Sequence, residues 1–253
     1  IVEVLYPDLS LGKNTYLKGR VESNQEKFRL TFKSPKVKVV DNFVKNIELQ
    51  VDNGNPLFNA FLEVDSLKTK HYSLSKVNLI NVTLNDTLFV RTEFTGGKKN
   101  KDQYHLNLYH TINSENRSVV GFKTSDITIK DNLWTLNNTN SNKIIFNKKL
   151  TEFRLEDIKL KHLNQEVSLS GAIKNSTEKD LKLNFKNVDL AKITPSIDSL
   201  SLAGRVNGRL DLLQKNGSYL PNSSVVVDGF TINDFLLGSF DASITGNADL
   251  TNY

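Results

Sequence analysis

The stretch LSLAGRVNGRLDL at residues 200–212 is the longest of several runs in which apolar and polar residues alternate. In a β-strand, side chains at positions i and i+2 project from the same face of the sheet. Leu202, Val206 and Leu210 would therefore lie on one face, while Arg205 and Arg209 lie on the other. This pattern predicts an antiparallel strand with one apolar face and one face exposed to water.

The same alternation recurs along the whole chain, so the prediction extends to a fold that is all-β. Further runs occupy residues 28–32, 47–51, 104–108, 167–173, 181–185 and 240–250. Segments rich in Asn and Gly, which tolerate positive φ angles and favour hairpin turns, separate them at 52–56, 96–100, 113–116, 137–140, 175–177 and 216–217. A short helix is expected around 189–196, and Pro195 limits its length.

The composition bounds the class of protein. The chain has 253 residues, a net charge of +5 and no cysteine, which excludes disulfides, a thiol nucleophile and zinc bound by cysteine. Methionine is absent, even at residue 1, from which we expect a piece of a longer chain. No apolar run is long enough to span a bilayer. The positive charge gives only weak support for an anionic partner. No nucleic-acid partner is expected, because the aromatic and basic residues of 28–33 alternate and would lie on opposite faces of a strand.

The domain organisation is predicted as one continuous β segment over residues 1–253. A weak internal similarity suggests repeat halves 1–120 and 121–253, because the runs at 17–21 and 28–33 resemble those at 169–173 and 181–186. Any two alternating segments can be aligned in this way, so the sequence leaves open whether the halves are true repeats.

No catalytic or metal-binding constellation is found, and the prediction is a protein that is not an enzyme and has no cofactor. Of the histidines His71, His105, His110 and His162, the two central ones are separated by five positions and would lie on opposite faces of a strand. Glu156 and Asp157 are adjacent, so they cannot act as a paired acid and base. The basic loop at 96–101 lacks the ending of a phosphate-binding loop and is expected to be a solvated hairpin tip.

Whether a second layer of protein covers the apolar face decides which function we expect. Two packed sheets would bury it, whereas one long sheet bent across its strands would form an open apolar groove. Glycines at apolar-face positions, Gly171, Gly204, Gly208 and Gly246, fit a sheet that bends sharply, although glycines also mark simple bulges. We favour the open groove, a long, curved and mainly antiparallel sheet.

The residues expected to line this groove are the apolar members of the alternating runs. They are Phe28, Leu30, Phe32, Ile47, Leu49, Leu106, Leu108, Leu169, Ile173, Leu181, Leu183, Phe185, Leu200, Leu202, Val206, Leu210, Phe240 and Ile244. An ordinary dry core needs the same alternation, so the pattern alone does not separate the two.

The order of several segments resembles the TamB family of envelope proteins, within the wider AsmA-like group. The segments are SDITIKDNLW (125–134), LTEFRLEDIKL (150–160), NQEVSLSG (164–171), LKLNFKNVDL (181–190) and LSLAGRVNG (200–208). The similarity covers about residues 120–253, and residues 1–119 share its texture less specifically.

This resemblance implies a β-taco, a gutter of strands with an apolar interior that carries the acyl chains of phospholipids. It further implies a periplasmic location, an inner-membrane anchor outside this segment, and lipid transport between the inner and outer membranes. An outer-membrane assembly partner similar to TamA, and a role in outer-membrane protein assembly, are implied as well. The main alternative is a β-rich envelope module for binding or adhesion, and an enzyme is a third and weaker candidate.

Overall fold

The chain forms an all-β structure, as the alternating runs predict. A computed structural model describes residues 8–70, 72–139, 141–195, 197 and 200–246, and every strand among them belongs to one antiparallel sheet of 19 strands. His71, Ser196 and the last residues of the predicted run 240–250 lie outside the described residues. The structure divides into two compact units, residues 1–107 and 108–253, which are described separately.

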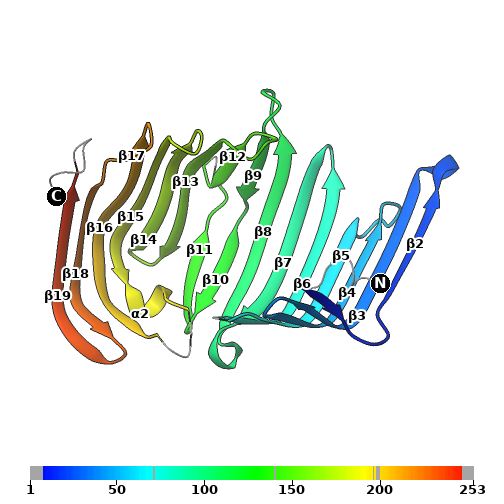
Figure 1. The fold of residues 1–253 in the computed structure, drawn as a ribbon, viewed down its shortest axis with the longest axis horizontal. Helices are drawn as coiled ribbons and strands as arrows, with labels where there is room; N and C mark the ends of the chain where they lie inside the picture. The colour runs from blue at the N-terminus through cyan, green and yellow to red at the C-terminus, as the bar shows by residue number, and fades with distance from the viewer. Residues whose placement is uncertain (1–7, 71, 140, 196, 198–199, 247–253) are drawn as a thin grey trace. The chain divides into compact units, whose positions relative to one another are not determined.

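In the N-terminal unit, the strands from β2 to β7 form a meander in which successive strands pair antiparallel, and β1 pairs with β3 (Figure 1). Its elements are β1 (Leu9–Leu11), β2 (Tyr16–Glu22), η1 (Ser23–Gln25), β3 (Lys27–Val39), β4 (Asn42–Asp52), β5 (Ala60–Lys68), β6 (Ser73–Leu84), β7 (Thr87–Gly96) and η2 (Lys98–Asn100). The strand β8 (Asp102–Ile112) crosses the boundary between the units.

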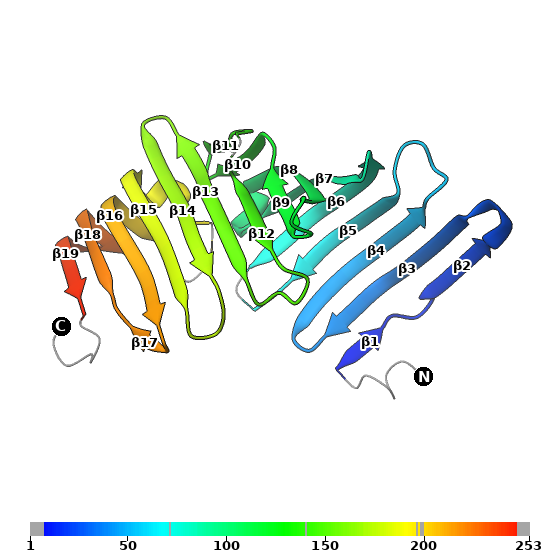
Figure 2. The ribbon, with the colours of Figure 1, turned by 90° about the horizontal axis from the view of Figure 1, so that it is seen from above.

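The C-terminal unit continues in the same style, and Figure 2 shows β13 to β16 running side by side. Its elements are β9 (Ser118–Phe122), β10 (Ser125–Ile129), β11 (Asn132–Leu136), β12 (Lys143–Phe146), β13 (Phe153–His162), β14 (Gln165–Ile173), β15 (Lys179–Asp189), α2 (Leu190–Ile193), β16 (Leu202–Lys215), β17 (Ser218–Tyr219), β18 (Asn222–Ile232) and β19 (Phe235–Thr245).

Several hairpins are closed by two residues that both have positive φ. Such pairs join β6 to β7 at Asn85–Asp86, β10 to β11 at Lys130–Asp131, and β18 to β19 at Asn233–Asp234. This backbone matches the right-handed twist of the flanking strands, and Asn and Asp tolerate it better than most residues. The tight turns therefore hold the strands in the register that keeps apolar residues on one face.

Four short strands, β9, β10, β11 and β12, interrupt the regular array of long strands in the C-terminal unit. The buried Asn142 fills the interruption before β12 and satisfies the local backbone. Its amide nitrogen donates to the carbonyl of Asn137, and its side-chain oxygen accepts from the Lys159 amide at 2.7 Å. Its backbone binds Phe122 at 2.9 Å and Glu156 at 2.8 Å. One polar residue thus ties three strand segments together.

Two long strands each contain an asparagine with positive φ whose side chain bonds the neighbouring strand. Asn46 in β4 and Asn187 in β15 both adopt positive φ within a strand. The Asn46 side chain donates to Asp65 at 2.6 Å, and the Asn187 oxygen accepts from Arg205 at 2.7 Å. At Asn187 the pairing of β15 with β16 shifts register, which marks a bulge that bends the strand and increases its twist. At Asn46 the register of β4 with β3 and β5 does not change.

Three of the four glycines expected at bends occupy conformations reserved for glycine. Gly171, Gly204 and Gly208 have φ between +123° and +129°. Each lies beside a shift in strand register, so each also marks a bulge. Gly246 is different, because its φ is not positive and it lies against Pro221.

The two segments proposed as repeats pair in different registers. Leu17 lies opposite Phe32, whereas Leu169 lies opposite Leu183, not the Phe185 that the alignment of the segments would require. Both segments are hairpins of the same kind, with pairings that differ by two residues.

Candidate apolar binding face

The strand register of the C-terminal unit gathers apolar residues into rows that cross the sheet. Residues that lie opposite one another on paired strands project from the same face. One row runs Leu160, Val167, Phe185, Gly208, Val225 and Ala242; another Ile158, Leu169, Leu183 and Leu210; a third Leu155, Gly171, Leu181 and Leu212; and a fourth Val188, Val206, Val227 and Phe240. We call this side the apolar face of the C-terminal unit.

The opposite side of the same strands is polar. The row that alternates with the apolar rows runs Lys159, Ser168, Asn184, Arg209, Ser224 and Ser243. The C-terminal unit is therefore amphipathic across its thickness.

The N-terminal unit has an apolar face built in the same way. Its rows are Leu17, Phe32, Leu49, Leu62 and Leu79; Gly19, Leu30, Val51 and Ala60; and Ser34, Ile47, Val64 and Val77. On the other side, Lys33, Glu48, Glu63, Asn78 and Glu93 form a polar row. Most of these apolar residues are half-buried, and Val64 is buried.

Part of the C-terminal apolar face is sealed by α2. Trp134 and Val188 are completely buried there, and Val206, Val225 and Val227 beside them are buried as well. Leu190 and Ile193 of α2 pack against this cluster. The Trp134 Nε1 donates to the Lys192 carbonyl at 2.7 Å. Beyond α2 the same face is only partly covered, since the side chains of Leu210 and Leu212 are 44% and 42% exposed.

The residues expected to line a groove fall into three groups by exposure. Val206 is buried; Leu30, Phe32, Ile47, Leu49, Leu106, Leu108, Leu169, Ile173, Leu181, Leu183, Phe185 and Leu202 are half-buried; and Phe28, Leu200, Leu210, Phe240 and Ile244 are exposed. Leu200 precedes β16, which begins at Leu202. Most of the set is thus neither sealed in a core nor fully solvated.

The groove-lining residues expected from the sequence do not include several residues of the area that α2 seals. Val225 and Val227 lie in an alternating segment of β18, and Val188 follows the chosen 181–185 run, so alternation was a usable signal for them. Leu190 and Ile193 belong to α2, whose docking on Trp134 joins residues 58 positions apart, and no local pattern signals such a contact.

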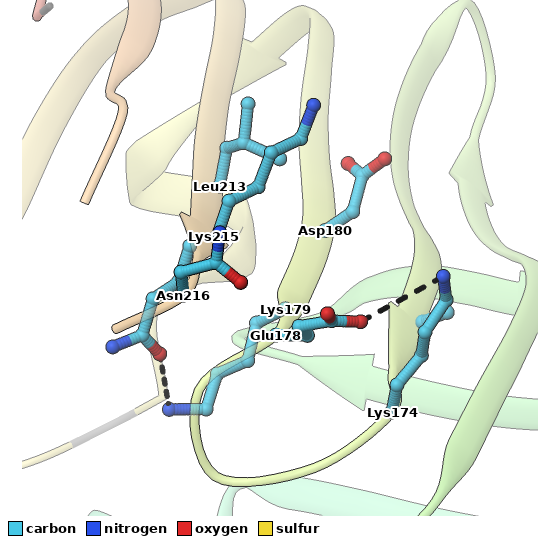
Figure 3. A pocket seen from close by; sticks show the side chains of 9 residues that line it. Lys174, Glu178, Lys179, Asp180, Leu213, Lys215 and Asn216 are labelled. Atoms are coloured by element: carbon cyan, nitrogen blue, oxygen red, sulfur yellow. Dashed lines mark hydrogen bonds and ion pairs between the residues drawn. The ribbon is translucent and has the colours of Figure 1, made fainter. Parts of the chain in front are cut away.

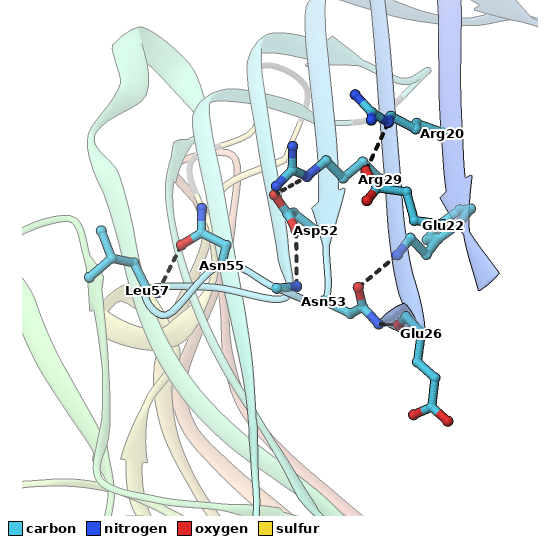
Figure 4. Close-up of polar contacts among 10 residues, drawn as sticks. Arg20, Glu22, Glu26, Arg29, Asp52, Asn53, Asn55 and Leu57 are labelled. Atoms are coloured by element: carbon cyan, nitrogen blue, oxygen red, sulfur yellow. Dashed lines mark hydrogen bonds and ion pairs between the residues drawn. The ribbon is translucent and has the colours of Figure 1, made fainter. Parts of the chain in front are cut away.

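Ion pairs line the polar side of the N-terminal unit. Arg20 contacts Glu22 at 2.8 Å and Arg29 contacts Asp52 at 3.1 Å, beside the turn that follows β4 (Figure 4). Asn53 completes that turn by donating to the Glu26 carbonyl at 2.7 Å. These exposed pairs keep this side in water and add little stability each.

The exposed ion pairs also perturb two groups in opposite directions. The Lys33 ammonium lies 2.7 Å from the Glu48 carboxylate. Their hydrogen bond raises the pKa of Lys33 and lowers the pKa of Glu48. A similar bond to Asp157 raises the pKa of Lys159. Lys33, Glu48 and Lys159 therefore stay charged at neutral pH.

A pocket of about 350 Å³ lies between the β14–β15 turn and the end of β16 (Figure 3). Lys174 approaches Glu178 at 3.8 Å, and Lys179 donates to the Gln214 side chain at 2.8 Å. Ala172, Asp180 and Leu213 of its lining belong to one row on the polar side of the sheet. Lys179 and Gln214 of the lining lie in the row of Ile173, so residues from both sides of the sheet line this pocket at the ends of the strands. A second pocket of about 240 Å³ is lined in part by Asn46 and Ile47 of β4.

The structure also places the residues weighed for chemistry. The His162 ring packs at a tilt against Trp134 with ring centres 5.3 Å apart, and its Nδ1 lies 2.7 Å from the Leu133 carbonyl oxygen. Glu156 pairs with Lys143 at 3.1 Å, whereas Asp157 pairs with Lys159 at 2.6 Å. Across the described residues, no cluster of His, Cys, Asp and Glu is arranged to bind a metal ion.

A buried polar cluster fastens the N-terminal unit near β8. The Tyr72 hydroxyl donates to the completely buried Asp102 carboxylate at 2.8 Å and lies 2.9 Å from the Tyr104 hydroxyl. The Tyr72 ring packs over Gly96, where no larger side chain would fit. Burial, together with these two hydrogen bonds, strongly raises the pKa of Tyr72, and burial raises the pKa of Tyr104.

We expect Tyr72→Phe to lower the free energy of unfolding by about 1–3 kcal/mol at pH 8, because it removes a hydrogen bond to a buried carboxylate. A tyrosine of the unfolded chain ionises above its ordinary pKa of 10.0, while Tyr72 in the folded protein keeps its proton. The stability that Tyr72 contributes is thus complete below pH 10 and is lost above it, by about 1.4 kcal/mol per pH unit. Urea unfolding followed by circular dichroism at pH 8 to 11 tests this. A difference between the two proteins that does not shrink above pH 10 contradicts the assignment.

Comparisons with known proteins find no relative of this chain. No protein-family model, curated protein or solved structure matches the chain. Among the described residues, no helix has the length and apolarity needed to cross a membrane. The resemblance to the TamB family therefore stays a prediction from the sequence.

Proposed function

We propose that the apolar face binds the acyl chains of lipids, and that the protein is a non-enzymatic carrier of phospholipid in the cell envelope. The observation that carries this proposal is the set of apolar rows on a single sheet. No second sheet covers these rows within the described residues, and most of their side chains are only half-buried. Monomeric proteins rarely expose large contiguous apolar areas unless something binds them.

The energetics suit a carrier. Each methylene removed from water contributes about 0.8 kcal/mol, so a chain of about 16 carbons gains on the order of 10 kcal/mol on the apolar face. That gain offsets most of the cost of leaving a bilayer. Successive strands offer similar apolar rows, so neighbouring positions bind a chain with similar energy and a lipid can slide along without a deep trap. No bond is made or broken in such a process.

The wider role follows the resemblance to the TamB family. On this proposal the chain is part of a periplasmic bridge, anchored to the inner membrane outside this segment, that moves phospholipid between the inner and outer membranes. Support of outer-membrane protein assembly with a partner similar to TamA belongs to the same proposal. The polar side of each unit, rich in ion pairs, is suited to face the aqueous periplasm.

Mass spectrometry of a solvent extract of the purified protein tests the proposal. We expect phospholipid in an amount comparable to the protein, and none from an unrelated soluble protein purified in parallel. An extract without lipid, from protein that also takes up none from phospholipid vesicles, would contradict the proposal and favour a binding or adhesion module.

A further inference from the structure

Burial changes abruptly along one face of β16. Val206 is 4% exposed, whereas Leu210, four residues further along and on the same face, is 44% exposed. The two residues occupy equivalent places in the apolar rows, opposite Val188 and Leu183 of β15. The strand itself therefore does not explain the difference, which coincides with the edge of the area that α2 covers.

The α2 helix is held over this area by few contacts. Leu190 and Ile193 supply its apolar contacts, and neither they nor any other residue of α2 is itself buried. The polar contacts to other strands are the bond from Trp134 to the Lys192 carbonyl and the bond from the Asp189 amide to the buried Gln165 side chain, each 2.7 Å. The Asp189 carboxylate caps the helix by accepting from the Ala191 amide at 3.0 Å. A single helical turn is not stable alone, so its structure depends on this docking.

The route of the chain through α2 is unlike the neighbouring connections. β13 and β14 are joined by two residues between His162 and Gln165, and β18 and β19 by two between Ile232 and Phe235. The connection from β15 to β16 runs from residue 190 to residue 201 and carries α2 over the apolar face (Figure 1). Adjacent antiparallel strands need no such length.

We infer that α2 is a displaceable stopper that occupies an acyl-chain site, formed by Trp134 and the buried valines beneath it. While α2 is docked, Leu190 and Ile193 occupy the positions that the hydrocarbon of a lipid takes when α2 is displaced. The inference rests on the proposed function, and it adds a specific site and a means of keeping that site dry when no lipid is bound.

The competition favours a long acyl chain over α2. Two half-buried side chains supply the apolar contacts of α2. An acyl chain of about 16 carbons can cover the same valines and continue onto the exposed leucines beyond them. A ligand that binds only the open form shifts the population toward that form. The apparent affinity is lowered by the fraction of time that α2 is docked.

Trp134 reports on this site without a label, because it is the only tryptophan of the chain. Bromine atoms quench tryptophan emission on contact. The experiment titrates the protein with stearate and with 9,10-dibromostearate, measuring binding by calorimetry and quenching by fluorescence. We expect both fatty acids to bind with similar affinity, and only the brominated one to quench most of the Trp134 emission.

A paired variant tests the competition. Replacing Leu190 and Ile193 together by alanine weakens the docking of α2, and we expect stearate to bind about tenfold more tightly. The control is Leu133→Ala, which removes an exposed side chain next to Trp134 and should leave the affinity unchanged. If the double variant binds more weakly, α2 is part of the binding wall and the inference is wrong.

The outcomes separate this inference from the proposed function. Binding of dibromostearate without quenching of Trp134 means that chains occupy only the exposed part of the face, which overturns the inference and leaves the proposed function standing. A failure of both fatty acids to bind the wild-type protein overturns both. Quenching in the wild-type protein supports the inference even if the double variant does not fold.

Discussion

Leu183→Asp should abolish the binding of lipid while the protein stays folded. Leu183 lies at the centre of an apolar row, between Leu169 and Leu210, and is half-buried. A carboxylate here would be covered by the acyl chain without a partner, at a cost of at least about 2–3 kcal/mol. That cost corresponds to a loss of roughly 30-fold or more in affinity.

The matched control is Asn184→Asp, which introduces the same charge one residue away on the polar side. Asn184 lies opposite Ser168 and Arg209, so a carboxylate there has a cation nearby. Co-purified phospholipid, measured by mass spectrometry, should be lost in the first variant and kept in the second. Circular dichroism verifies that both are folded. Should folded Leu183→Asp protein keep its lipid, the apolar face is not the binding site.

Gly171→Ala is expected to be the most destabilising small substitution in the C-terminal unit. Gly171 has a φ of +129°, and a Cβ atom there would lie 1.9 Å from the Asp180 carbonyl oxygen of the paired strand. Backbone cannot move aside as a flexible side chain does, so the strands must separate locally. We expect a loss of about 4 kcal/mol or more, because steric overlap adds to the strain of the backbone.

Gly217→Ala separates the two causes. Gly217 also has a positive φ, +83°, but nothing lies within 4 Å of the position of its Cβ. Only backbone strain remains, so the expected cost is about 1–2 kcal/mol. Urea unfolding followed by Trp134 fluorescence measures both variants. Equal losses would show that the close approach of Asp180 is not what fixes glycine at position 171.

The strands could be predicted from the sequence because the alternation that indicates them involves only neighbouring residues. Alternation at 28–32 correctly put the rings of Phe28 and Phe32 on the apolar side and Arg29 on the charged side, where it pairs with Asp52. The turns at 175–177 and 216–217 connect strands as expected. A period of two needs only neighbouring residues to be read, and the sheet obeys it.

Features that depend on distant residues could not be predicted. The helix expected at 189–196 forms at 190–193 and ends before Pro195, but nothing local indicates that it docks on Trp134. Asn46 within β4 and Val40 in the turn after β3 take positive φ, which the alternation of residues does not indicate. The degree to which the apolar face stays uncovered depends on this same kind of long-range contact.

The pairing of strands in chain order has a consequence for how the protein opens. In a meander such as β13 to β16, each strand is held mainly by the strands before and after it in the chain, so most contacts are short in sequence. Such an array behaves as a row of coupled units that unzip separately, not as one globule that melts at once. Amide hydrogen exchange should therefore be slowest in β15 and β16 beside α2 and become faster strand by strand toward β19.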